Sequence, residues 1–123
     1  MKLELLDEPF AIHRFSPSAK IPDEVFGEAF FNIVKTEEEL SIVCRNALTL
    51  NSEHCNQGWS CIKVAGPLDL NGTGILEKLS KVLAEAQISI FAISTYDTDY
   101  ILIPSKKTNA AVVALNDADF RFI

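Results

Sequence analysis

The chain has 123 residues, and its composition and charge limit the kinds of protein it can be. A hydrophobic content of 48% predicts a single sizeable core, or two small halves that share one. A formal charge of −6, with no cluster of Lys or Arg, argues against nucleic acid as a partner. No apolar run reaches the ~20 residues that span a bilayer, and the acidic start is unlike a signal peptide. We therefore expect no membrane partner and a cytoplasmic location.

The first strands are expected near the start of the chain. Leu3–Leu6 and Phe10–Phe15 are short β-prone runs, and the Asp7–Pro9 segment between them has turn chemistry. The simplest arrangement of two such runs is a hairpin. The stretch Ser16–Asp23 carries two prolines and predicts no regular element.

Two further strands are predicted before residue 57. Ala29–Val34 and Leu40–Cys44 are rich in strand-forming residues. Between them, Thr36 followed by Glu39 has the form of a capping box, which predicts a short helical turn. Asn46–Gln57 has the polar composition of a surface loop.

A strand, a loop and an amphipathic helix are predicted next. Ser60–Gly66 is β-prone, and Pro67–Gly72 is rich in residues that break regular structure. From Ile75, apolar residues recur at three- and four-residue steps and charged residues occupy the opposite face, which indicates a helix. Thr73 is the predicted N-cap. The apolar positions are Leu76, Leu79, Val82, Leu83 and Ala86.

Two apolar runs around a polar centre follow this helix. Ile88–Ser94 has apolar side chains on both faces of an extended chain, which predicts an inner strand. Tyr100–Ile103 is the second run, and the short link predicts an antiparallel hairpin with Asp97 and Asp99 at or near its tip.

The last predicted elements are a helix within Lys107–Leu115 and a strand within Phe120–Ile123. From Ser60 onward, the predicted order is therefore β-α-β-β-α-β. This is a ferredoxin-like α+β unit with a mainly antiparallel sheet.

The run from residue 66 to residue 103 resembles an ACT domain. Its most specific part is FAISTYDTDYILI, and the preceding GPLDLNGTG loop and helix match the same pattern. The chain is similar to small bacterial ACT proteins and to the ACT segments of the cytosolic arginine sensor and of aspartate kinase. The resemblance implies an ACT domain over residues 58–123 and a degenerate ACT-like half over residues 1–57. The C-terminal helix and strand are brief compared with the family pattern.

The resemblance also implies a function and a site. In similar ACT domains the loop after the first strand meets the second strand of a partner copy, and a free amino acid lies in the seam. This implies a homodimer that senses an amino acid such as arginine, lysine or threonine and needs no cofactor. Carried over to this chain, the ligand-binding residues are Asp69, Leu70, Asn71, Gly72, Thr73, Gly74, Phe91, Ala92, Ile93, Ser94, Asp97 and Asp99.

Individual roles follow from side-chain chemistry, and each has a structural alternative. Asp69 would take the ligand's ammonium, and Asp97 and Asp99 would favour a basic side chain if they face the seam. Gly72 and Gly74 suit close approach of a carboxylate, but they equally suit a tight turn. Aspartates at a hairpin tip commonly form turns without any ligand. The alternative function is therefore an ACT-fold protein that binds a partner and no ligand.

Catalytic and metal chemistry are not expected. Cys55 beside His54 and Ser94 near Asp97 are the nucleophile-base pairs available, and neither belongs to a recognisable triad. His54, Cys55 and Cys61 lack the spacing and the fourth ligand of a structural zinc site. The odd cysteine count suits free thiols in a reducing compartment.

Overall fold

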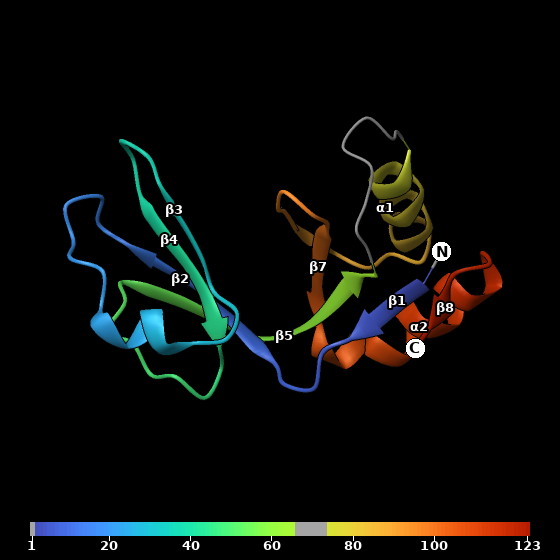
Figure 1. The fold of residues 1–123 in the computed structure, drawn as a ribbon, viewed down its shortest axis with the longest axis horizontal. Helices are drawn as coiled ribbons and strands as arrows, with labels where there is room; N and C mark the ends of the chain where they lie inside the picture. The colour runs from blue at the N-terminus through green and yellow to red at the C-terminus, as the bar shows by residue number, and fades with distance from the viewer. Residues whose placement is uncertain (1, 66–73) are drawn as a thin grey trace. The chain divides into compact units, whose positions relative to one another are not determined.

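The computed structural model describes residues 2–65 and 74–123, and the chain divides into two compact units (Figure 1). The strand unit is Glu8–Gly58, and the helix-bearing unit combines Met1–Asp7 with Trp59–Ile123. In sequence, the strand unit is thus an insertion into the helix-bearing unit. The predicted division at residues 57 and 58, with a degenerate ACT-like first half, stays a prediction.

The helix-bearing unit has the predicted β-α-β-β-α-β order, with one additional strand. The strand order in its sheet is β8-β1-β5-β7-β6, and every pair is antiparallel except β1 with β8. The ferredoxin-like α+β class is therefore confirmed. Within the described residues, no helix is long and apolar enough to cross a membrane. The elements are β1 (Lys2–Leu5), β5 (His54–Val64, which belongs to this unit from Trp59 onward), α1 (Ile75–Glu85), β6 (Phe91–Ser94), β7 (Asp99–Pro104), α2 (Thr108–Asp117) and β8 (Arg121–Phe122).

The additional strand, β1, shows that the predicted hairpin with Phe10–Phe15 is wrong. β1 pairs with β5, where Leu3 lies opposite Val64, and on its other side it pairs with β8. The pairing continues beyond β1, since the Leu6 amide donates to the Cys61 carbonyl at 2.9 Å. Leu3 is fully buried in the core of this unit. The burial of Leu3 favours pairing of β1 with the distant strand β5. The turn residues at Asp7–Pro9 carry no information about that distant pairing.

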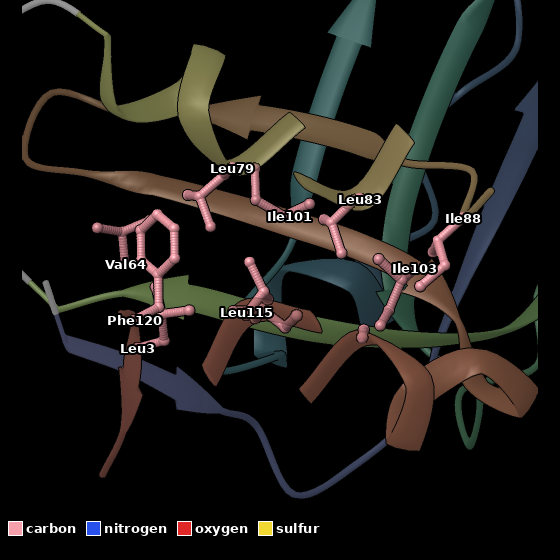
Figure 2. Packing of buried hydrophobic residues seen from close by; sticks show 11 residues of the cluster. Leu3, Val64, Leu79, Leu83, Ile88, Ile101, Ile103, Leu115 and Phe120 are labelled. Carbon is pink, nitrogen blue, oxygen red and sulfur yellow. The ribbon is translucent and has the colours of Figure 1, made fainter. Parts of the chain in front are cut away.

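The two helices and the sheet enclose one apolar core (Figure 2). Leu79 and Leu83 from α1 and Leu115 from α2 are fully buried against sheet residues such as Ile101 and Ile103. Burying one such side chain is worth about 1.5–3 kcal/mol. The predicted helical periodicity is confirmed, because the positions that it assigned to the apolar face supply this core.

Two local predictions in this unit fail. The N-cap position of α1 is Gly74 rather than Thr73, which lies outside the described residues. The strand predicted over Ile88–Ser94 is ordered as a strand only over Phe91–Ser94, and in the described part of the chain β7 is its sole ladder partner. Among the described residues it is therefore an edge strand, and the prediction of an inner strand is wrong. The apolar Ile88 and Ile90 instead pack on the core from the segment that links α1 to β6.

The strand unit contains β2 (Phe10–Phe15), β3 (Asn32–Lys35) and β4 (Leu40–Arg45), in the order β3-β4-β2, with β5 next to β2. A 3-10 turn over Asp23–Gly27 precedes β3. The strand predicted at Ala29–Val34 therefore begins later, and β5 begins inside the loop that was predicted up to Gln57. One core cluster of the strand unit consists of the buried residues Phe15, Val25, Leu40 and Ile42.

The segment Thr36–Glu39 is a β-turn region that joins β3 to β4, so the predicted helical turn is wrong. Thr36 Oγ1 accepts the amides of Glu38 and Glu39 at 3.1 and 3.2 Å, and the Thr36 amide donates to the Glu39 carbonyl at 2.9 Å. A threonine hydroxyl satisfies the same two amides in a tight turn as at a helix start. The capping-box pattern alone does not distinguish them.

An ion cluster joins three parts of the strand unit. The guanidinium of Arg45 donates to both carboxylate oxygens of Glu28, at 3.0 and 2.9 Å, and to Glu8 at 3.2 Å. The side chain of Glu28 is only 5% exposed. The hydrogen bonds from Arg45 hold the pKa of Glu28 below its ordinary value, although burial opposes them. The segment before β3 is thus tied to β4 by a bidentate pair.

Candidate functional site

The predicted ligand loop is described only at its last residue. The expected ligand residues Asp69, Leu70, Asn71, Gly72 and Thr73 lie outside the described residues. Gly74 is described: its φ of 89° is left-handed, and it is the first residue before α1. An added Cβ would meet nothing within 4 Å, so the backbone conformation, rather than a lack of space, requires glycine here.

The other expected side of the site is the edge strand β6. Ala92 and Ser94 are exposed, Phe91 is half-buried and Ile93 is buried. Ala92 lies opposite Ile101, whose side chain is part of the core between sheet and helices. Because cross-strand partners project to one face, Ala92 and Ser94 lie on the helix-covered face of the sheet. The strand therefore offers small, exposed side chains and its outer backbone edge together.

Hydrogen bonds fix the tip of the β6–β7 hairpin. The Thr95 amide donates to the Thr98 carbonyl at 2.8 Å, and the Thr98 amide donates to Thr95 Oγ1 at 3.2 Å. The buried Thr98 hydroxyl donates to the Val64 carbonyl at 2.6 Å, which ties the tip to β5. The hydrogen bonds that close the turn thus come from its threonines.

The two aspartates of the hairpin differ in position. Asp99 lies opposite Ser94 and accepts its hydroxyl at 2.6 Å through Oδ1. Asp97 lies in the turn with an exposed side chain. Tyr96 beside it is 82% exposed. Asp99 keeps further acceptor capacity, because an ionised carboxylate has about four lone-pair sites and this bond uses one.

The nucleophile-base pairs considered from the sequence do not form. Ser94 bonds Asp99 rather than Asp97. His54 Nε2 lies 3.6 Å from Glu53, while Cys55 faces the imidazole of a different histidine, His13. Cys44 and Cys61 are buried, and burial raises the pKa of their thiols to about 11 and about 12. Both are therefore protonated at neutral pH.

Sequence reasoning missed the pairing of His13 with Cys55. His13 is 3% exposed on β2, between Ala11 and Phe15, which are also buried. The alternation of the strand could have placed His13 on an inward face. Its partner could not have been identified, since Cys55 is distant in sequence and lies in a segment predicted as a loop.

Comparison with known proteins supplies the family. A sequence model described as the ACT domain matches residues 54–117. A second model, of an N-terminal domain, matches residues 8–48.

Solved structures resemble the whole chain. Protein Atu0741 from Agobacterium tumefaciens is 34% identical, with a TM-score of 0.91 over 99% of this chain and 91% of that one. A protein of unknown function from Vibrio cholerae is 20% identical, with a TM-score of 0.71 over 94% and 88% of the two chains. The regulatory subunit of aspartate kinase from Thermus flavus is 13% identical, with a TM-score of 0.68 over 96% and 97%. At these identities the latter two show the fold alone.

Proposed function

Because this chain belongs to the ACT-domain family, we propose that it is a non-catalytic regulatory module that binds a free amino acid between two copies of itself. The observation that carries the proposal is the edge strand β6. Its exposed Ala92 and Ser94 and its single ladder partner in the described residues leave one side available to a second copy. Edge strands of this kind pair readily with another chain.

The ligand in this proposal is held from two sides. The Asp69–Gly74 loop of one copy receives the ammonium and carboxylate of the amino acid, and β6 of the other copy closes the pocket. The likeness to the aspartate kinase regulatory subunit supports a regulatory role through its fold. Asp97 and the free acceptor positions of Asp99 favour a basic side chain, so arginine and lysine precede threonine as candidates.

Such a site couples ligand binding to assembly. Only the paired state has both sides of the pocket, so ligand and dimer stabilise each other. The protein should therefore show a higher dimer affinity when its amino acid is present.

The direct test is thermal unfolding of the protein with each proteinogenic amino acid in turn. A ligand at about 100 times its dissociation constant stabilises a site by about 2.7 kcal/mol, which is readily visible. One amino acid that stands out supports the proposal and names the ligand. A flat panel contradicts it and favours the alternative, a module that binds a partner protein without a ligand.

Variants then locate the site. Gly74→Asp places a negative charge where the carboxylate would approach, and Gly74→Ala is its matched control, because both lose the favourable left-handed backbone of glycine. Binding lost in Gly74→Asp and kept in Gly74→Ala supports the loop, and equal binding by both excludes it. Asp69→Asn should weaken binding by about 1.5–3 kcal/mol.

The role of β6 as the dimer interface is tested by measuring dimer formation rather than ligand binding. Ala92→Lys places a charge at the exposed edge of β6, and Ala84→Lys places the same charge on the exposed face of α1. We expect sedimentation to show a weaker dimer only for Ala92→Lys. Equal dimer affinities would show that β6 is not the interface.

A further inference from the structure

A buried imidazole and an exposed thiol face each other in the strand unit. Cys55 Sγ, at the start of β5, lies 3.9 Å from Nε2 of His13 on β2. The other ring nitrogen of His13 lies 2.8 Å from Oγ of Ser52. All three residues belong to Glu8–Gly58, and Cys55 is exposed while His13 is not.

We propose that Cys55 Sγ and His13 Nε2 together bind one soft, thiophilic metal ion of the copper(I) type. Thiolate and imidazole are the ligands that such ions prefer. In the metal-free chain the thiol can donate to Nε2 when the imidazole carries its proton on Nδ1. On binding, the metal forms bonds to sulfur and nitrogen, the S–H bond breaks, and the proton passes to solvent.

The distance suits a metal with few protein ligands. If the bonds are as long as those of zinc, about 2.3 Å to sulfur and about 2.0 Å to nitrogen, the two atoms would be about 3.5 Å apart at a tetrahedral angle and about 4.3 Å apart in a linear arrangement. The observed 3.9 Å lies between them. Among the described residues, no group of three or more His, Cys, Asp or Glu could hold a metal. A water or a small thiol would therefore complete the coordination from the exposed side of Cys55.

The surroundings of His13 keep the lone pair of its Nε2 available to a metal ion. Burial lowers the pKa of His13, so the imidazole stays neutral and its lone pair stays available. When Nδ1–H donates to Ser52 Oγ, the lone pair of Nε2 faces the thiol. Ser52 is thus a positioning residue. Burial also raises the pKa of Cys55, so one proton is released for each ion bound at neutral pH, and acid weakens binding.

The test is an anaerobic titration of the full chain with copper(I) against a chromogenic copper(I) chelator. We expect one ion per chain, the loss of this binding in Cys55→Ser, and a weakening of about tenfold in Ser52→Ala. His13→Gln should weaken binding more than Ser52→Ala does. The matched controls are His54→Gln, an exposed histidine that contacts Glu53, and Cys61→Ala, a buried thiol, and both should bind as the wild type does.

A second measurement uses the unaltered chain, so it does not depend on the folding of any variant. Iodoacetamide alkylates accessible thiols, and mass spectrometry of the peptides reports the rate at Cys55. Bound copper(I) should protect Cys55 from alkylation. Equal alkylation with and without the ion, or copper(I) binding that survives in Cys55→Ser, would overturn the proposal.

Discussion

The two units of this chain are stabilised in different ways. The helix-bearing unit packs two amphipathic helices on a sheet, and its core is apolar. The described part of the strand unit has no α-helix, and its apolar core is accompanied by the ion cluster of Arg45, Glu28 and Glu8. An apolar face that repeats along a helix is visible in the sequence, whereas a cluster of distant charges is not. For this reason the sequence predicted the helices of the helix-bearing unit but not the ion cluster of the strand unit.

The largest effect should come from cavities in the two cores. Leu79→Ala in α1 and Leu40→Ala in β4 each truncate a fully buried side chain, and each should lower the free energy of unfolding by about 2–5 kcal/mol. Urea unfolding, followed by far-UV circular dichroism and by the fluorescence of Trp59, measures both. A loss in one variant well below this range would show that the core of that unit relaxes around the cavity.

A smaller effect is expected at the hairpin of the helix-bearing unit. Thr98→Val keeps the shape of the side chain but removes the buried hydrogen bond to the Val64 carbonyl. The free energy of unfolding should fall by about 1–3 kcal/mol. Thr95→Val is a useful comparison, because Thr95 bonds within the turn and is exposed. If both variants lose the same stability, the link to β5 is not what anchors the tip.

The ion cluster of the strand unit should make the free energy of unfolding depend on pH. The pKa of Glu28 is lower in the folded chain than its ordinary value of 4.5, so its stabilisation is present above that pH and is lost as pH falls through the folded pKa. Glu28→Gln should therefore be less stable than the wild type at about pH 7, and the gap should narrow at about pH 3. Urea unfolding at both pH values measures this. A gap that is unchanged in acid would mean that packing, not charge, accounts for the loss.

The smallest effect is expected at the surface of the strand unit. Arg14 and Glu53 form an ion pair at 2.6 Å, but their side chains are 41% and 51% exposed. Glu53→Gln should change stability by only about 0.2–1 kcal/mol, and less in high salt. Unfolding of the variant and the wild type in low and high salt provides the measurement. A loss as large as that of Thr98→Val would show that this pair is shielded from solvent.

Much of the helix-bearing unit could be predicted from the sequence. The periodic apolar residues from Ile75 placed α1, and the two runs around Asp97 placed the β6–β7 hairpin. The errors lie where one local pattern serves two structures. A threonine with glutamate three residues later begins helices but also closes the turn at Thr36, and a run such as Ile88–Ser94 supplies core residues without being a strand throughout.

Sequence proximity also misassigned partners. His54 is adjacent to Cys55 along the chain, yet strand alternation sends neighbours to opposite faces and brings the distant His13 to the thiol instead. The same holds for Ser94, which bonds its cross-strand partner Asp99 rather than the nearer Asp97. The predicted loop from Asp69 to Thr73 lies outside the described residues, so its part in ligand binding stays a prediction.

The placement of β1 has a consequence for synthesis on the ribosome. β1 leaves the exit tunnel before both of its neighbours, β5 and β8, because the whole strand unit is translated in between. The strand unit can fold once residue 58 has emerged, while β1 still lacks both of its partner strands. Pairings between such distant segments form slowly, and exposed strand edges invite aggregation in the meantime. During synthesis, the helix-bearing unit therefore finishes folding after the strand unit.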